Sequence, residues 1–505
     1  MKRFYSKLTF AFILSLILLV SVFAVSAFAA EAVDGDIIWK YTPNDTNKTA
    51  TIDSVTIVSE KTQKFDIPAY FEVEKDGVVT TYTVTAIKDN AFNNNKKVFG
   101  VLTIPDTVTS IGNSAFSGTY ILGELVIPES VETIGENAFY NCFGLTKVTL
   151  SSNVSTIKKQ AFHKCKSLSE INTENVDTFG EKCFYDCKAL LSVDLSSALA
   201  IGKEAFAECY SLNGTYDLTN VETIDLSAFK NCQRITGFVV PNSSSNVLDL
   251  FVGCISLENV HASESHTAFK SVDGILFSKD EKTIVYYPLA RSDSSYTIPS
   301  KVTSIGNTAF AKAINLEKII MHENVTNIGA GAFSYSAIKS CYIPDGVTSI
   351  NVDTFKGCTD AEWIVIGAGV ASVGVDAFAS TSSNLVVYTK NENLTRPANI
   401  RSYIIASEYQ CVNHRYGYLD KEPTCDEYGY NKCVICGRLA YVKELGHSGP
   451  IVKKIPLTCT TNASSIVKCL TCNQTVEIIS QKCPGHTAHF VSTAKTETTL
   501  PWMQH

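Results

Sequence analysis

Residues 122–145 read LGELVIPESVETIGENAFYNCFGL, and this stretch decides the fold. Its apolar residues occupy a fixed frame: Leu-x-x-Leu-x-Ile-Pro, then Val-x-x-Ile-Gly, then Ala-Phe-x-x-Cys-x-x-Leu. Residues 145–168 repeat that frame, with Val148 and Leu150 in the first part and Phe162 and Cys165 in the last. One polypeptide segment is therefore copied along the chain.

The Ala-Phe pair, or a close variant, recurs through most of the sequence. Its phenylalanines are Phe92, Phe116, Phe139, Phe162, Phe184, Phe206, Phe229 and Phe251, and then Phe310, Phe333, Phe355 and Phe378. Within each series the steps are only 22 to 24 residues. A fixed period of this length indicates a solenoid, because one coil cannot bury its own apolar face and stacked coils can.

Each part of the frame predicts a piece of one coil. The Leu-x-x-Val-x-Ile part predicts a short strand with alternating inward residues. Proline, which cannot continue a ladder, follows this strand at Pro105, Pro128, Pro299 and Pro344. Glycine, which permits tight corners, comes next at Gly112, Gly135, Gly306 and Gly329. The phenylalanine is expected to fill the wide, convex side of the coil.

The segment Ile104-Pro105-x-x-Val108-x-x-Ile111-Gly112-x-x-Ala115-Phe116 resembles the BspA-like, or Treponema-type, leucine-rich repeat of bacterial and protozoan surface proteins. The resemblance covers about residues 35–390. It implies a right-handed, mainly β repeat solenoid with short helical or 3-10 turns, a curved rod with a parallel sheet on its concave side. It also implies adhesion or host-protein binding as the usual role, which the periodicity alone does not indicate.

Two regions depart from the frame. Residues 30–85 lack it, and the β-branched run 77–85 predicts a strand or hairpin, so an N-terminal cap is expected before the solenoid at 86–390. The step from Phe251 to Phe310 is 59 residues, and an inserted hairpin is expected at about 262–298. It is either an elongated coil or a protruding binding element.

The N-terminus has the pattern of an export signal. Lys2, Arg3 and Lys7 precede an apolar stretch from Leu8 to Val25, and Ala27-Phe28-Ala29 offers a cleavage site. Residues 1–29 are therefore expected to be a signal peptide, with an uncleaved anchor as the alternative. After cleavage no later segment is apolar enough to span a membrane, and a secreted or surface-retained protein follows.

Seven cysteines stand three residues after a frame phenylalanine: Cys142, Cys165, Cys187, Cys209, Cys232, Cys254 and Cys358. Equivalent positions in adjacent coils stack within disulfide distance, although their side chains should point the same way. The main prediction is a row of buried thiols that pack the core, since cysteine behaves as a small apolar residue there. Some disulfide pairing is the alternative.

Residues 391–410 form a polar junction, and residues 411–505 hold eight of the 17 cysteines. Two related units follow each other, each with three thiols and one imidazole. Their candidate metal ligands are Cys425, Cys433, Cys436, His447, Cys459, Cys469, Cys472 and His486. This set suits tetrahedral zinc, whereas disulfides are the usual fate of cysteine in exported proteins. Cys411 and Cys483 would allow four bridges, so both readings stay open.

Composition and motifs exclude several function classes. The net charge is −7 and no run of basic residues occurs, which argues against nucleic acid as a partner. Gly-x-Ser-x-Gly, His-Glu-x-x-His and phosphate-binding glycine loops are all missing from the sequence, so no enzyme is predicted. His163, His261 and His322 fall in separate coils and are expected at the surface.

The concave sheet is the candidate binding surface, and its outward row is the residue before the last apolar strand position. These residues are Thr103, Val126, Thr149, Asn172, Asp194, Asp217, Val239, His261, Ile320, Tyr342 and Val365. Exposed Val, Ile and Tyr would suit protein binding, although β-branched residues also simply favour strands.

A monomer that binds extracellular or host proteins is the leading hypothesis. A structural envelope protein and a polysaccharide-binding module are the alternatives, and the latter would need aromatic side chains along the row.

Overall fold

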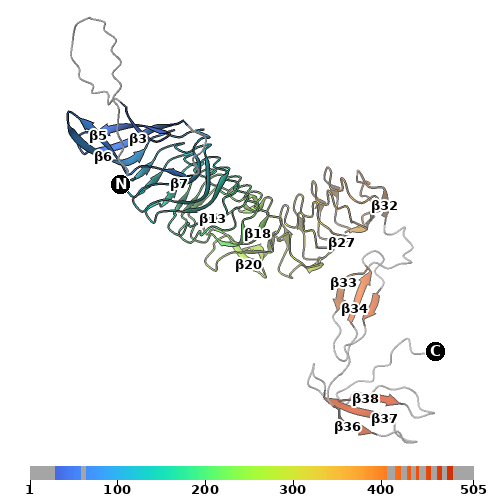
Figure 1. Ribbon diagram of the computed structural model, residues 1–505. Coiled ribbons are helices and arrows are strands. Elements are labelled where there is room, and N and C mark those ends of the chain that lie inside the picture. The colour runs from blue at the N-terminus through green and yellow to red at the C-terminus, as the bar shows by residue number, and fades with distance from the viewer. Residues whose placement is uncertain are drawn as a thin grey trace. The chain divides into compact units, whose positions relative to one another are not determined.

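The computed structural model describes residues 29–58, 64–397 and 399–405, and the backbone of six further strands between 416 and 481. The chain is a mainly β solenoid of stacked coils (Figure 1). The described part contains a single 3-10 turn, η1 (Leu248–Phe251), and no α-helix. The chain divides into two compact units, of which the first comprises residues 1–294, 301–316 and 328–337 and the second the remainder.

In the first unit most coils contribute a strand of up to seven residues to one side, which we call the long-strand face; residues 191–197 form no strand there. Its sheets are β4 (Lys64–Asp66), β7 (Phe99–Thr103), β9 (Tyr120–Val126), β11 (Gly144–Thr149) and β13 (Glu170–Ile171), and then β16 (Asn213–Asp217), β18 (Arg234–Val239) and β19 (Asn259–His261). All of these strands pair in parallel. This is the sheet that the sequence predicts to be concave.

Two-residue strands stack on another side of the coils. They are β8 (Ser110–Ile111) and β10 (Thr133–Ile134), which continue the cap sheet, and then β12 (Thr156–Ile157), β14 (Thr178–Phe179), β15 (Ala200–Ile201) and β17 (Thr223–Ile224). This short-strand sheet was not part of the sequence prediction. Its strands coincide with the Val-x-x-Ile part of the frame, whose last apolar residue is buried in every strand except β17, where Ile224 is half-buried.

The cap consists of β1 (Ala30–Asp34), β2 (Ile37–Asn44), β3 (Thr49–Ile57), β5 (Tyr70–Lys75) and β6 (Val78–Ile87). The first three strands are antiparallel, whereas β3 pairs in parallel with β6, and β6 with β8 of the first coil. Buried aromatic rings close this end: Tyr41 stacks on Phe71 at 4.1 Å, and Trp39 lies 5.3 Å from Phe65.

The inserted region forms β20 (Phe269–Val272), β21 (Ile275–Ser278) and β22 (Thr283–Tyr286), which pair antiparallel. Strand β22 then pairs in parallel with β24 (Ser304–Ile305), and β26 (Asn327–Ile328) ends this sheet. The insertion packs on the core, since the Tyr286 ring lies 4.6 Å from Phe251 and residues 275–277 are buried. An elongated coil therefore describes it better than a protruding element.

In the second unit the long-strand sheet is parallel throughout. It comprises β23 (Ser295–Thr297), β25 (Lys318–Ile320), β27 (Ser340–Ile343), β29 (Trp363–Ile366), β31 (Val386–Thr389) and β32 (Ser402–Ile405), and β28 (Ser349–Ile350) pairs with β30 (Ser372–Val373). Two antiparallel three-stranded sheets follow. They are β33 (Tyr416–Lys421), β34 (Gly429–Cys433) and β35 (Leu439–Val442), and β36 (Ile451–Ile455), β37 (Ala463–Lys468) and β38 (Thr475–Gln481).

The core of the first unit is organised around the frame phenylalanines. Phe116, Phe139, Phe162 and Phe184 are fully buried, and adjacent rings stack with centroids 5.3 to 5.6 Å apart and interplanar angles of 3 to 5°. The centroid spacing is close to the strand separation in a sheet, about 4.8 Å, because both report the coil repeat. The aromatic stack and the sheets therefore share one register.

The cysteines form the predicted row of buried thiols. In six of the seven the Sγ–H donates to the carbonyl of the phenylalanine in the preceding coil, as Cys165 does to Phe139 at 3.1 Å and Cys187 to Phe162 at 3.1 Å. Cys142, Cys209, Cys232 and Cys254 make the same contact at 3.1 to 3.5 Å. The same carbonyl accepts the backbone N–H of the cysteine in its own coil or, for Phe116, of Thr119.

The corner glycines have a different role from the predicted one. Gly112 and Gly135 do not have positive φ; instead, a Cβ on either would lie 2.5 Å from the backbone nitrogen of Asp89 or Asn113 in the preceding coil. Close approach of two coils excludes a side chain there. The left-handed corners fall two residues before and after the phenylalanine, at residues such as Gln160 (φ 55°) and Lys164 (φ 61°).

Candidate functional site

The long-strand face of the first unit presents alternate side chains outward, as strand pleating requires. In β7 the side chains of Phe99, Val101 and Thr103 are exposed, while Gly100 and Leu102 are buried. The register brings Phe99 opposite Tyr120 of β9, and Thr149 of β11 opposite Val126 of β9. Outward residues of successive coils thus form continuous rows.

The predicted concave row is mostly solvent-accessible. Thr103, Val126, Thr149, Asp194, Asp217 and His261 are exposed, and Asn172, Val239 and Ile320 are half-buried. The expectation of an outward, accessible side chain is wrong for Tyr342 and Val365, which are 5% and 0% exposed. Whether the row binds a partner stays a prediction.

An apolar cluster lies on the N-terminal coils of this face. It consists of Phe99 (40% exposed), Val101 (46%), Val126 (58%), Phe143 (41%) and the half-buried Tyr120. The Tyr120 and Phe143 rings meet edge to face at 5.0 Å. We call these five residues the N-terminal apolar patch. Sequence analysis found only Val126; Phe99 and Val101 follow from the same alternation, four and two residues before Thr103.

Charged side chains of both signs accompany the patch. Lys147 lies between Glu124 and Glu170 of the neighbouring strands, with Nζ to carboxylate distances of 3.8 and 3.6 Å. All three side chains are at least 42% exposed, so these ion pairs contribute little to stability. Their position beside exposed apolar residues matches the polar rim of a protein interface.

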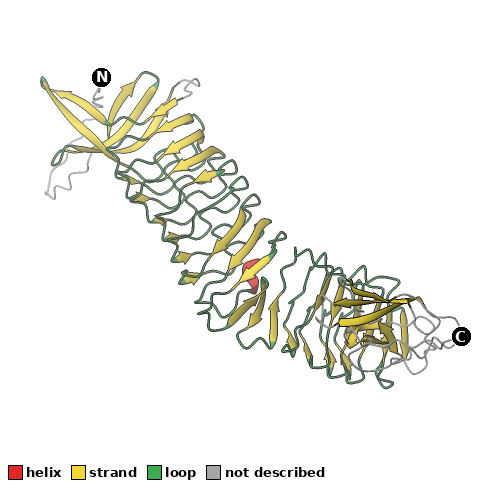
Figure 2. Ribbon diagram, turned by 90° about the horizontal axis from the view of Figure 1, so that it is seen from below, coloured by secondary structure: helices red, strands yellow, loops and turns green. Residues whose placement is uncertain are grey.

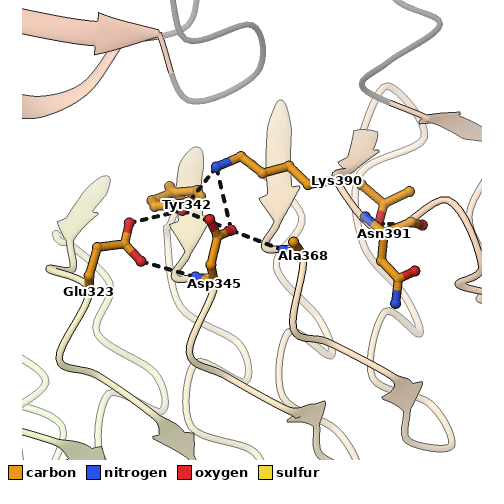
Figure 3. Close-up of polar contacts among 7 residues, drawn as sticks. Glu323, Tyr342, Asp345, Ala368, Lys390 and Asn391 are labelled. Atoms are coloured by element: carbon orange, nitrogen blue, oxygen red, sulfur yellow. Dashed lines mark hydrogen bonds and ion pairs between the residues drawn. The ribbon is translucent and has the colours of Figure 1, made fainter.

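Tyr342 of the second unit is buried because a polar network closes over it (Figure 3). Its single hydroxyl proton is shared between Glu323 Oε1 at 3.0 Å and Asp345 Oδ1 at 3.2 Å, and the hydroxyl oxygen accepts from Lys390 Nζ at 3.1 Å. The Lys390 ammonium also lies 4.6 Å from the ring centroid. A cation over an aromatic face is favourable, so Lys390 both covers and stabilises the ring.

The same network holds the ends of three strands together. Glu323 Oε2 accepts the Asp345 N–H at 3.1 Å, and Asp345 Oδ1 accepts the Ala368 N–H at 2.9 Å. Burial opposes ionisation of Asp345, but the Ala368 bond and the Lys390 charge outweigh it and lower the pKa of the carboxyl. Burial, followed by the two carboxylates, raises the pKa of Tyr342. Every partner is internal, so this cluster is structural.

Val365 is buried for a related reason. It lies opposite Tyr342 on one side and Tyr388 on the other in the parallel register, and Trp363 precedes it by two residues on the same face. Large side chains in flanking positions cover a smaller residue between them. The sequence prediction assumed that every residue of the concave row is equally exposed. It took no account of the side chains in adjacent strands.

His163 is buried, which corrects its predicted surface position. Its imidazole lies between the rings of Tyr140 and Tyr185, with centroids 4.8 and 4.9 Å away and interplanar angles of 14°. Its Nδ1 has no hydrogen-bond partner among the described residues. Burial, assisted by Lys164 and Lys182, lowers the pKa of His163 to about 4.

The predicted zinc ligands lie outside the described residues, apart from Cys433, which ends β34 and whose side chain is not described. Within the described part of the chain no group of three or more His, Cys, Asp or Glu is arranged to hold a metal ion. No described helix is long and apolar enough to cross a membrane. The zinc and disulfide readings of the tail both stay predictions.

The repeat geometry agrees with sequence comparison. A family model described as "BspA type Leucine rich repeat region" matches residues 85–213, 200–280 and 286–405, in six copies and over more than half of the chain. The chain belongs to the BspA-type leucine-rich repeat family. The match begins at the end of the cap, includes β20 and β21, and is interrupted at residues 281–285, where β22 begins.

Solved structures of bacterial leucine-rich repeat proteins are similar to this BspA-type chain. A leucine-rich cell surface protein from Faecalibacterium prausnitzii is 24% identical, covering 72% of this chain and 94% of that one, with a TM-score of 0.43. A leucine-rich repeat protein from Bacteroides ovatus is 21% identical (74% and 91% covered, TM-score 0.44). The pneumococcal vaccine antigen PcpA is 20% identical (75% and 86%, TM-score 0.37). No curated protein matches the chain.

Proposed function

We propose that this BspA-type protein is exported, is not an enzyme, and binds other proteins through the long-strand face of its N-terminal coils. The N-terminal apolar patch carries the proposal. Four of its side chains, on three adjacent coils, are 40% or more exposed. Single exposed apolar residues are common on protein surfaces, whereas a cluster of them is not. Clustered apolar residues next to mixed charges are typical of protein-binding surfaces.

The patch has the composition expected of interface anchors. Aromatic residues contribute much of the binding energy in protein interfaces, and Phe99 and Phe143 expose their rings while their backbone is held by the stacked coils. Because the sheet is rigid, little conformational entropy would be lost on binding. Export is supported by the leader-like residues 1–29.

The test uses the mature chain, residues 30–505, binding to intact cells of bacterial and epithelial origin before and after surface proteolysis. The variant is Phe99→Ser combined with Val126→Ser, and the matched control is Val375→Ser, which changes a 77% exposed valine outside the patch. Loss of two anchors is expected to weaken binding by at least about ten-fold, and proteolysis of the cells should abolish it.

Three results would contradict the proposal: absence of cell binding at micromolar protein, equal binding by the patch variant and the control, or binding that survives proteolysis but is lost after periodate oxidation of surface sugars. The last result would support the polysaccharide alternative. Circular dichroism of each variant separates lost binding from lost folding.

A further inference from the structure

The coil that follows β17 breaks the repeat frame. Residues 241–251 read PNSSSNVLDLF, whereas the corresponding residues 128–139 read PESVETIGENAF. Phe251 stands ten positions after its proline and Phe139 eleven, so this coil is one residue short. Ser244 replaces the buried Val131, and the polar run 242–246 has neither the apolar nor the β-branched residues of a strand.

The short-strand sheet therefore stops at this coil. The chain forms the 3-10 turn η1 there, the red segment in Figure 2, and the next strands of that side belong to the separate sheet β20–β26. In the preceding coil the Leu199 and Ile201 carbonyls accept backbone N–H groups of Glu222 and Asp225, both at 2.9 Å. The equivalent carbonyls of Glu222 and Ile224 accept none from the described residues, and β17 pairs only with β15.

A notch opens beside this strand edge. Its apolar lining is Ile224, Leu226 and Val252, and its polar lining is Asp225, Ser227, Lys230 and Asp249. Ile224 is half-buried, whereas its counterparts Ile111, Ile134 and Ile201 are all buried. Val252 is 45% exposed. The missing strand thus leaves an apolar lining, and two carbonyl acceptors that no described backbone N–H uses.

We propose that this notch binds an extended polypeptide strand of another protein by β-augmentation of β17. Carbonyls that repeat along a strand edge are complementary to the N–H groups of an added strand. Ile224 and Val252 would contact an apolar side chain of that strand. Two carboxylates against one lysine favour a basic side chain beside it. The site lies away from the N-terminal apolar patch and does not depend on the function proposed for that patch.

The experiment measures binding of acetylated, amidated heptapeptides to the full mature chain. The probes alternate Val with Lys, alternate Val with Glu, or alternate Val with Lys and carry N-methyl groups on alternate amides. A repaired chain carries a copy of residues 129–135 in place of Asn242–Val247, which restores the frame and should extend the sheet over the notch. A second variant, Asp249→Lys, changes charge only.

The Val/Lys peptide is expected to bind with a Kd below about 1 mM, at least ten-fold more tightly than the Val/Glu and N-methylated peptides. The repaired chain should lose this binding while unfolding at a higher urea concentration, and Asp249→Lys should weaken it with an unchanged circular dichroism spectrum. The proposal would be overturned if the Val/Lys peptide did not bind at 1 mM, or if the N-methylated peptide bound as tightly as the Val/Lys peptide. It would also be overturned if the repaired chain and Asp249→Lys bound the Val/Lys peptide as tightly as the unchanged chain. The patch variant Phe99→Ser/Val126→Ser should bind the peptide normally.

Discussion

Single residues at the third position after the core phenylalanine show how the coils are joined. Cysteine there donates its thiol proton to the phenylalanine carbonyl of the preceding coil, whereas Thr119 and Ser336 at the same position donate to the carbonyl of their own coil. A small side chain with one donor satisfies the site in these coils, whereas the buried Ala313 fills the same position after Phe310 without a donor. The cysteines are therefore core residues, with no requirement for disulfide chemistry.

Burial predicts that these thiols are chemically silent in the native protein. It raises the pKa of Cys142 and Cys254 to about 12, and that of Cys165, Cys187 and Cys232 well above the usual value. Because the thiolate is the reactive form, iodoacetamide at pH 8 should label none of these residues until the chain is unfolded in guanidinium. Rapid labelling of Cys187 in the folded protein, located by peptide mapping, would contradict the buried row.

His163 predicts part of the acid sensitivity of the solenoid. Its pKa is lowered to about 4 in the folded state from 6.5, so the unfolded chain gains a proton first. The contribution of the neutral, buried imidazole is present above pH 6.5 and is lost as the pH falls toward 4, by up to about 2 kcal/mol at pH 5.

The variant His163→Phe keeps the stack and removes the titration. Its urea midpoint should change less between pH 7.5 and pH 5 than that of the unchanged protein. The control His261→Phe removes an exposed histidine and should leave the pH dependence unaltered. Parallel pH profiles for the unchanged protein and His163→Phe would show that the buried imidazole does not govern this dependence.

At the scale of the element, stacked phenylalanines link each coil to the next from Phe92 to Phe229. Phe162 is fully buried between Phe139 and Phe184. Phe162→Ala should therefore lower the free energy of unfolding by about 3–5 kcal/mol, measured by urea denaturation. The control Phe143→Ala removes a ring that is 41% exposed, and it should change the free energy of unfolding by less than about 0.5 kcal/mol. Similar losses in the two variants would contradict the stacked core.

Some elements could be predicted from the sequence and others could not, for physical reasons. The strand pattern Leu-x-x-Val-x-Ile and the buried Phe162 and Cys165 follow from alternation and period alone. The two-residue strands such as β12 were missed because their residues do not alternate over a long enough run. Gly135 was predicted at a corner because glycine permits tight turns. The actual reason is the close approach of the preceding coil, which the sequence of one repeat does not reveal.

The candidate site was only partly predictable for the same reason. Val126 was identified because its own strand directs it outward, and the same alternation before Thr103 would have found Phe99. The exposed neighbour Phe143 lies outside the strand pattern and could not be found in this way. Tyr342 and Val365 were wrong because residues from adjacent coils cover them. Strand periodicity determines the direction of a side chain, whereas accessibility depends on what the next coils place beside it.

At the scale of the whole molecule, the Cys/His-rich tail is proposed to consist of two zinc-stabilised units. Elemental analysis of the mature protein is expected to find two zinc ions per chain, with the tail thiols free after chelation and denaturation. Removal of zinc with EDTA should then destabilise the tail and leave the pH 7.5 urea transition of the solenoid unchanged. A metal-free protein with all eight tail cysteines oxidised would contradict the zinc proposal and would support four disulfides in its place.

The proposed function requires that partner proteins bind at the N-terminal apolar patch. A photo-crosslinking residue, benzoyl-phenylalanine, placed at Val126 in the mature chain and at Val375 as the control tests it most directly. Illumination of the protein on living cells should crosslink the Val126 derivative to discrete, protease-sensitive species at least several-fold more than the Val375 derivative. Equal yields from both positions, or products only from Val375, would contradict the claim.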